Sequence, residues 1–305
     1  MEIRISPETL RGARLFVGCP MYDGRCHGEF TFALCQLSAL ASELGLALEL
    51  FFASGEALVM KARNAIVDRF LRSDATHLML IDSDIGFAAR DVLALLALAL
   101  ADAGHNHYDV LSAPYPIKRM AWARIAQAAR AMPAGADPEW LARIAGDPLF
   151  HPAQPGAFEL GRPVAVTQAG TGFMLIRRAT FDAFRAAYPH RRYLSDGRGI
   201  EAGAGRFISQ FFDTAITGSE TLADDLAAFL TANPAADRAA IERYLAERPG
   251  EPGAYVSEDI HFCRLVGAIG LGLWSCPWME LSHIGSHGFA GHFAALAGLA
   301  ADPRP

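Results

Sequence analysis

The amino-acid sequence predicts an α/β fold with a mainly parallel central sheet. In the first half of the chain, short β-rich runs alternate with longer segments of helical periodicity, a pattern typical of βαβ units. Hydrophobic residues make up 52% of the 305 residues and charged residues 20%, as expected of a chain that folds around a large core. We therefore predict a single domain over residues 1–305, with insertions near 120–161 and 197–253.

The predicted elements follow one another along the chain. Strands are expected at 15–18, 46–52, 77–81, 108–113, 164–166, 170–176 and 271–276. Helices are expected at 29–44, 57–71, 90–103, 180–188, 221–230, 237–246 and 257–266. The apolar run at 77–81 is long enough for a strand buried on both faces. Five prolines between residues 120 and 161 predict a partly helical insertion, and the glycines of 197–205 predict a loop.

Charge and cysteine content disfavour several classes of protein. A net charge of −6 supplies no general basic face for nucleic acid. The N-terminus lacks the basic-then-apolar pattern of a secretory signal, and no uncharged apolar run reaches the roughly 18 residues that a transmembrane segment needs. Five cysteines without a CxxC pair argue against a disulfide framework or a structural zinc site. We expect a cytoplasmic protein.

The sequence Asp82-Ser83-Asp84 is the strongest candidate for a functional site. It directly follows the buried strand predicted at 77–81, and open α/β sheets bind ligands beyond the carboxyl ends of their strands. Mg²⁺ and Mn²⁺ prefer oxygen ligands and often bind through one or two carboxylates together with substrate phosphates. The spacing therefore indicates a divalent-metal site for a nucleotide diphosphate, although a solvated turn would use the same residue types.

Several segments, in order along the chain, resemble the GT-A glycosyltransferases. The run 76–85 resembles the DxD strand of that family, and Ala62-Arg63-Asn64 precedes it on a predicted helix. Later segments resemble the glycine-rich acceptor segment, the "SED" helix start and the C-terminal histidine segment of the family, at 169–174, 257–263 and 281–285. The similarity covers roughly residues 14–118 and 164–290. It looks like that of bacterial DxD-containing members and, more distantly, of fungal mannosyltransferases.

The resemblance implies a metal centre and a catalytic carboxylate. It places Asp82 near the donor ribose or the metal, makes Asp84 the main ligand of Mn²⁺ or Mg²⁺, and lets His283 complete the metal site. His287 or His292 could take the place of His283, because loops flanked by glycine tolerate shifts. Glu258 and Asp259 are expected at a helix N-terminus facing the acceptor hydroxyl. In an inverting enzyme one of them, with Asp259 favoured, is the general base, whereas in a retaining enzyme the carboxylate only positions the substrate. Retention or inversion stays open, as does an acidic helix cap without a catalytic role.

Four further residues are expected at the donor. Tyr22, at the end of the first strand, can stack on the nucleobase. Arg63 can bind phosphate or lock Asp82, because a guanidinium offers two parallel hydrogen bonds. Asn64, beside it in the same helical segment, and Ser83, inside the DxD sequence, complete the predicted donor set.

The predicted function is metal-dependent transfer of a sugar from a UDP- or GDP-sugar to an acceptor hydroxyl. The acceptor is a glycan, a lipid or a protein, and a homo-oligomer and peripheral docking on a membrane stay open. A sugar-nucleotide-binding protein or a nucleotidyltransferase of the same fold is the alternative, but pyrophosphorylases carry a glycine-rich, lysine-containing signature that residues 17–21 lack. A dehalogenase-type phosphatase is disfavoured, because it carries its DxD on the first strand.

Overall fold

A computed structural model of the chain describes residues 3–101, 107–133, 137–201, 203, 205–217, 222–247, 253–285 and 288–291. Its centre is an eight-stranded sheet in the order β2-β1-β3-β10-β5-β15-β9-β8. The strands are β1 (Arg14–Met21), β2 (Ala47–Ser54), β3 (His77–Ile81), β5 (Val110–Ser112), β8 (His151–Pro152), β9 (Val164–Gln168), β10 (Phe173–Arg177) and β15 (Leu273–Ser275). The fold is therefore mixed α/β with one large sheet.

Most strands of this sheet share one direction. β1 is parallel to β2 and β3, and β5 is parallel to β15, whereas β10 is antiparallel to both β3 and β5, and β9 is antiparallel to β15. The prediction of a mainly parallel sheet is confirmed, and these two strands are its exceptions.

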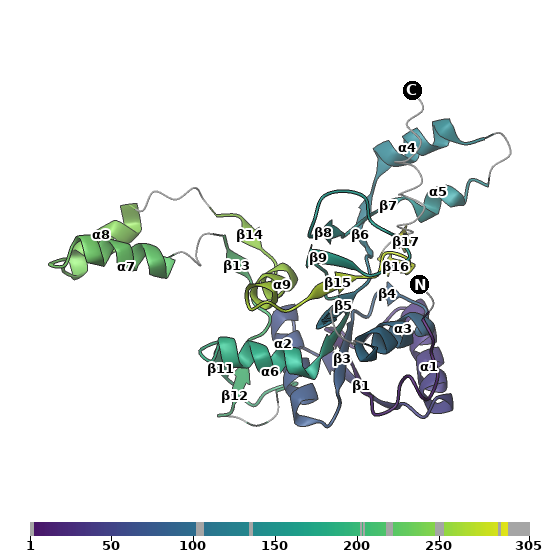
Figure 1. Cartoon of the computed structure of the whole chain (residues 1–305), viewed down its shortest axis with the longest axis horizontal. Helices are drawn as coiled ribbons and strands as arrows, with labels where there is room; N and C mark the ends of the chain where they lie inside the picture. The colour runs from purple at the N-terminus through teal and green to yellow at the C-terminus, as the bar shows by residue number, and fades with distance from the viewer. Residues whose placement is uncertain are drawn as a thin grey trace.

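Helices cover both faces of the sheet (Figure 1). One face carries α1 (Gly28–Glu43) and α3 (Ala89–Leu100), and the other carries α2 (Val59–Arg72), α6 (Arg178–Ala187) and α9 (Glu258–Ala268). These five helices and two more described below match the predicted ones to within three residues at each end, wherever the structure describes those ends. The result is a three-layer arrangement with the sheet in the middle.

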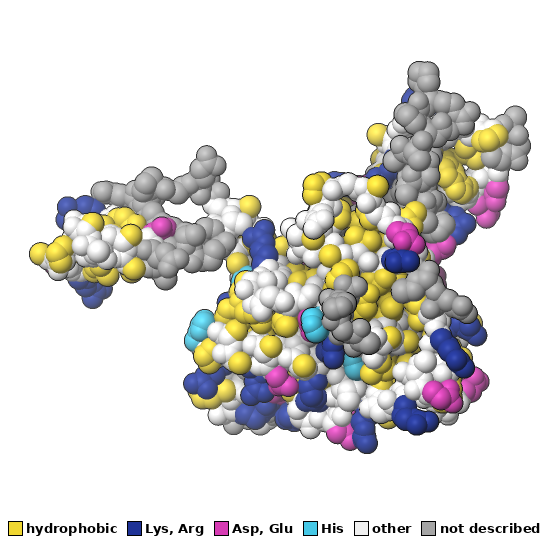
Figure 2. Space-filling view, viewed as in Figure 1, with side chains coloured by type: hydrophobic (Ala, Val, Ile, Leu, Met, Phe, Trp, Pro, Cys, Tyr) yellow, Lys and Arg dark blue, Asp and Glu magenta, His cyan; other side chains and the backbone are white. Residues whose placement is uncertain are grey.

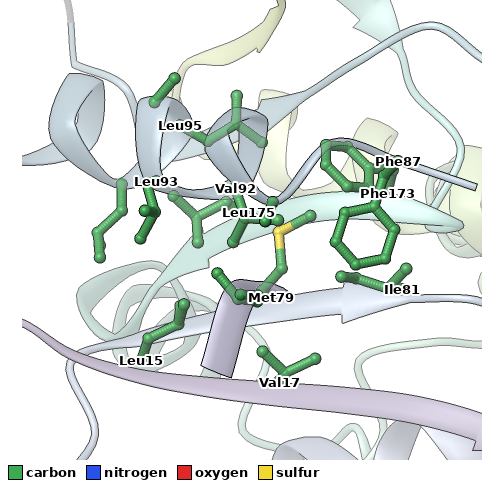
Figure 3. Close-up of a cluster of buried hydrophobic side chains, with 14 of the residues drawn as sticks. Leu15, Val17, Met79, Ile81, Phe87, Val92, Leu93, Leu95, Phe173 and Leu175 are labelled. Atoms are coloured by element: carbon green, nitrogen blue, oxygen red, sulfur yellow. The ribbon is translucent and has the colours of Figure 1, made fainter. Parts of the chain in front are cut away.

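Alternating residues of the strands build two separate cores. Met79 and Ile81 of β3 pack with α1 and α3, while Leu78 and Leu80 pack with α2, α6 and α9, because successive side chains of a strand point to opposite faces. Figure 3 shows the first core, where side chains of α3 meet those of β1, β3 and β10. Every residue of β3 is buried, which confirms the strand predicted from the run at 77–81 and fixes the position of the turn that follows it.

Two small sheets lie at the carboxyl edge of β3. The first consists of β17 (Gly288–Gly291), β16 (Leu281–Ile284) and β4 (Ile85–Gly86), in that order. The second pairs β6 (Pro116–Met120) with β7 (Gly146–Pro148). The sequence did not predict these strands, because runs this short carry no recognisable period. They bring residues of β6 and β16 to the acidic turn.

The two ranges predicted as insertions both contain helices. The first contains α4 (Trp122–Ala131) and α5 (Trp140–Arg143). The second carries α7 (Leu222–Ala232) and α8 (Arg238–Glu247), which project from the body on β13 (Ala215–Ile216) and β14 (Tyr255–Val256) (Figure 1). Figure 2 shows hydrophobic side chains on the surface of this arm. Leu230 and Leu245 are exposed large hydrophobic residues of α7 and α8. A further hairpin, β11 (Arg192–Leu194) and β12 (Phe207–Ser209), flanks the glycine-rich loop.

Candidate functional site

The acidic turn Asp82-Ser83-Asp84 lies directly after β3. The amide of Asp82 donates to the carbonyl of Gly172 at 3.0 Å, and the carbonyl of Asp82 accepts from the amide of Ile85 at 3.0 Å. The chain thus turns at once into β4. All three turn residues are partly exposed, while the residues on either side are buried, so the turn opens to solvent at a fixed place. The expected position of the acids at a strand's carboxyl end is confirmed.

Arg63 of α2 binds two acids of this site at once. Its Nη2 donates to both oxygens of Asp82, at 2.9 and 3.0 Å, and its Nη1 donates to Oε1 of Glu258. Burial by itself would lower the pKa of Arg63, which is 4% exposed, but the charges of Asp82 and Glu258 raise it above its usual range. A permanent positive charge therefore joins three elements, α2, the end of β3 and the start of α9.

Asp84 has two different partners, one on each carboxylate oxygen. Nζ of Lys118, on β6, lies 2.5 Å from Oδ2, and Nε2 of His283, on β16, lies 3.5 Å from Oδ1. Burial would raise the pKa of Asp84, but its hydrogen bonds to His283 and Lys118 and their charges lower it to about 2. Asp84 is therefore an ionised carboxylate, and its partners are different from Arg63, which binds Asp82 and Glu258.

The orientation of His283 is determined by β6. Its Nδ1 lies 2.9 Å from the carbonyl oxygen of Pro116, and because a carbonyl can only accept, Nδ1 carries the hydrogen. When the ring is protonated, Nε2 also carries a hydrogen and can donate it to Asp84, whereas in the neutral ring Nε2 offers a lone pair that a metal could bind. Metal-binding histidines are commonly oriented in this way, by donating their other N–H to a backbone carbonyl. The ring also packs edge-on against Tyr115, with centroids 5.5 Å apart.

The glycine-rich segment 170–172 lies against Tyr115. The amide of Gly172 donates to the Tyr115 hydroxyl at 3.2 Å. A Cβ on Gly172 would lie 2.9 Å from that hydroxyl and 3.2 Å from Oδ2 of Asp82, and one on Gly170 would collide with the same hydroxyl. Both positions thus need the absence of a side chain, which lets this segment approach the acidic turn. The segment precedes β10 and is not part of the strand, in contrast to the predicted range 170–176.

The start of α9 presents Glu258 and Asp259. Ser257 is the N-cap residue, as predicted, but its hydroxyl donates to Oδ1 of Asp259 rather than capping a backbone amide. The amide of Ile260 donates to the same oxygen at 2.8 Å. One oxygen of Asp259 is thereby anchored at a helix N-terminus. Among the interactions of the described residues, Oδ2 of Asp259 has no such partner, which leaves an acceptor oxygen for a substrate hydroxyl.

The side chain of Asn64 binds the backbone of a segment behind the site. Its Oδ1 accepts from the amides of Phe211 and Phe212, both at 2.9 Å, and its Nδ2 donates to the carbonyl of Phe212 at 2.8 Å. Phe212 in turn packs on Phe262 of α9, with ring centroids 4.6 Å apart. Asn64 is only 2% exposed. Its predicted role at the donor has no contact to support it, whereas its hydrogen bonds position the helix that carries Glu258 and Asp259.

Tyr22 and Ser83 lie at the same edge as the acids. β1 pairs with β3 with Gly18 opposite Leu80, so the residues after both strands emerge side by side. Tyr22 is 65% exposed, which leaves its ring free to receive a flat ligand. The carbonyl of Ser83 accepts from the amide of His27 at 3.0 Å, a contact that holds the turn to the start of α1.

Asp84 and His283 fit a divalent cation, and Asp82 fits it less well. Ligands lie about 2.1 Å from such an ion, so two ligands of one ion are at most about 4.2 Å apart, and 3.5 Å separates Oδ1 from Nε2. Asp82 would first have to release Arg63. Within the described ranges, no three His, Cys, Asp or Glu side chains form a ready metal cluster, so a bound diphosphate or water would have to supply further ligands. His287 and His292 lie outside the described residues.

Sequence reasoning missed Lys118 and Tyr115. Both follow β5, in a stretch with prolines at 114 and 116 that was expected only to end a strand. The available signal was their place in the chain, since β5 ends at the same edge of the sheet as β3 and whatever follows it arrives beside the acidic turn. These observations define a mixed α/β protein with a cluster of acidic side chains beyond the carboxyl ends of its parallel strands.

Comparison with known proteins adds little to this description. Neither a scan against protein-family models nor a search of curated protein sequences finds a match. A detectable structural likeness is to the crystal structure of A197 from STIV, with 13% identity, 89% of this chain and 86% of that chain covered, and a TM-score of 0.44. None of the helices in the described residues has the length and apolar character needed to cross a bilayer.

Proposed function

We propose that this chain is a metal-dependent glycosyltransferase of the GT-A type that uses a nucleoside-diphosphate sugar. The observation that carries the proposal is the pairing of Asp84 with His283, whose Nε2 lies 3.5 Å from Oδ1 of Asp84, directly beyond a buried parallel strand. A divalent cation held there would neutralise the charge that builds on the departing diphosphate. The carboxylate suits Mn²⁺ or Mg²⁺, and the imidazole suits Mn²⁺ less well than a carboxylate but is compatible with it.

The remaining residues divide into positioning and reacting groups. Arg63 fixes Asp82 and Glu258, so that the turn and the start of α9 keep a constant spacing. Tyr22 would stack on the nucleobase of the donor. Asp259, anchored through one oxygen, would accept the proton of the acceptor hydroxyl. As it does so, the hydroxyl oxygen of the acceptor bonds to the anomeric carbon of the donor sugar, and the bond from that carbon to the diphosphate breaks.

The test of this function is selective binding of one nucleoside diphosphate. Thermal unfolding would be followed with Mn²⁺ and UDP, GDP, CMP or dTDP, using the wild-type protein, Asp84→Asn, and Asp182→Asn as a matched control on the exposed side of α6. Binding stabilises the native state by about 2.7 kcal/mol at one hundred times the dissociation constant. We expect one diphosphate to raise the midpoint only with Mn²⁺, in the wild type and in Asp182→Asn. If none of the nucleotides shifts the wild-type midpoint, the donor-site assignment is wrong.

A further inference from the structure

The ammonium of Lys118 lies against Asp84 at the acidic turn, where a metal cation would otherwise sit. It lies on β6, and its Nζ is 2.5 Å from Oδ2 of Asp84, while Nε2 of His283 lies 3.5 Å from the other oxygen of the same carboxylate. The same strand also orients His283, through the carbonyl of Pro116. One short strand therefore supplies both a positive charge to Asp84 and the orientation of the histidine beside it.

The side chain of Lys118 is exposed enough to change partners, whereas the neighbouring Arg119 has its partner away from the acidic turn. It is 39% exposed, and a lysine ammonium on its flexible stem changes partners easily. The next residue, Arg119, binds Asp147 at 2.6 Å together with Arg124. Successive residues of a strand point to opposite sides, so this strand sends one cation to the acidic turn and the next one away from it.

A divalent cation and the Lys118 ammonium compete for Asp84. A cation held between Oδ1 and Nε2 would lie on the same carboxylate as the ammonium, and the two positive charges would repel each other. A displaced ammonium can bind the anion that such a cation brings, which for a nucleotide donor is a diphosphate. Lysine binds phosphate oxygens as a point charge.

We propose that Lys118 is the resident counter-ion of Asp84 and that, when a divalent cation replaces it there, its ammonium turns to the diphosphate of the donor. This inference rests on the proposed donor site. It makes Lys118 a positioning residue with two opposite effects. It weakens the binding of the metal alone, and it strengthens the binding of a nucleoside diphosphate together with the metal.

The experiment compares Lys118→Met with Lys118→Arg and with the control Arg119→Met, at one fixed pH. Free Mn²⁺, measured by its paramagnetic resonance signal, gives the affinity for the metal alone. Calorimetric titration with UDP and with GDP at saturating Mn²⁺ gives the affinity for the diphosphate. We expect Lys118→Met to bind Mn²⁺ several-fold more tightly and the diphosphate about tenfold more weakly, as for loss of one charged hydrogen bond. Lys118→Arg and Arg119→Met should stay close to the wild type in both measurements.

The outcomes separate this inference from the proposed function. If Lys118→Met changes both affinities in the same direction, or neither, Lys118 is not a counter-ion that changes partners, although the donor site still stands. If Arg119→Met changes the two affinities as much as Lys118→Met does, the effect comes from the surface charge in general, and this result would also overturn the inference. If the wild type binds neither UDP nor GDP, the proposed function and the diphosphate role of Lys118 both fall.

Discussion

One guanidinium nitrogen of Arg63 donates to both carboxylate oxygens of Asp82, at 2.9 and 3.0 Å. A second nitrogen of the same group binds Glu258. The side chain of Arg63 is 5% exposed, against 25% for Asp82 and 13% for Glu258. The group is therefore the centre of a largely desolvated network of three charges that joins α2, the end of β3 and the start of α9.

Removing this guanidinium should strongly destabilise the fold. Arg63→Met leaves two carboxylates without their cation, and breaking a buried ion pair from one side costs about 3–5 kcal/mol. The control Arg14→Met removes an exposed pair with Asp74 and should cost less than about 1 kcal/mol. Urea unfolding followed by circular dichroism measures both. Similar midpoints for the two variants would mean that Arg63 does not hold the site together.

The two aspartates of the turn should differ in kind. Asp82→Asn weakens the Arg63 network, so its main effect should be a lower free energy of unfolding, with a smaller effect on the free energy of Mn²⁺ binding. Asp84→Asn removes a partly exposed pair with Lys118 and replaces the carboxylate beside His283 by a neutral amide, so it should lower Mn²⁺ affinity at least about tenfold with little loss of stability. Chemical unfolding and Mn²⁺ titration on both variants decide the matter, and the reverse pattern would make Asp82 the metal ligand.

Gly170 and Tyr115 should be energetically coupled. A Cβ at Gly170 collides with the Tyr115 hydroxyl, and overpacking of this kind costs about 1–3 kcal/mol. Tyr115→Phe removes the colliding oxygen and should therefore recover part of the loss in a double-mutant cycle. Gly28→Ala, where a Cβ meets nothing within 4 Å, is the control and should be neutral or slightly stabilising. Strict additivity of the Gly170 and Tyr115 changes would refute the contact.

Stability should fall as the pH drops from about 6.5 to about 4, in part because of His77. Burial, together with the charge of Arg177, lowers the pKa of His77 from 6.5 to about 4. The neutral ring is thus favoured in the folded protein. Its contribution to the free energy of unfolding is complete above pH 6.5 and is lost as the pH falls toward 4. The difference of 2.5 pKa units corresponds to about 3 kcal/mol.

The check compares urea unfolding of the wild type with His77→Leu at pH 7 and pH 4. The wild type should lose about 3 kcal/mol more than the variant over that range, and the exposed His190→Leu should behave as the wild type does. Parallel curves for the wild type and His77→Leu would show that His77 is not buried in its neutral form.

The sequence predicted those parts of the molecule that depend on local pattern. The run at 77–81 is apolar on both faces of the strand, so both the buried position of β3 and the place of the acidic turn after it could be foreseen. The helices at α1 and α9 likewise carry their own periodicity and, at Ser257, their own N-cap.

Parts that depend on long-range contacts could not be predicted. β10 lies antiparallel between β3 and β5, a direction set by its neighbours and not by its residues. Lys118 reaches Asp84 only because β6, of five residues, passes the turn. Asn64 looked like a donor residue through its place beside Arg63, yet its amide is used by the backbone of Phe211 and Phe212.

The most direct test of the central claim is which bond of a bound sugar nucleotide is broken. The nucleotide selected by the binding panel would be supplied as its hexose derivative with Mn²⁺, and the products separated by ion-exchange chromatography, with water or an added glycoside as acceptor. A glycosyltransferase releases the nucleoside diphosphate, and this release should need Mn²⁺ and be lost in Asp84→Asn. Release of a nucleoside monophosphate with a sugar phosphate, or no cleavage of any donor that binds, would contradict the assignment.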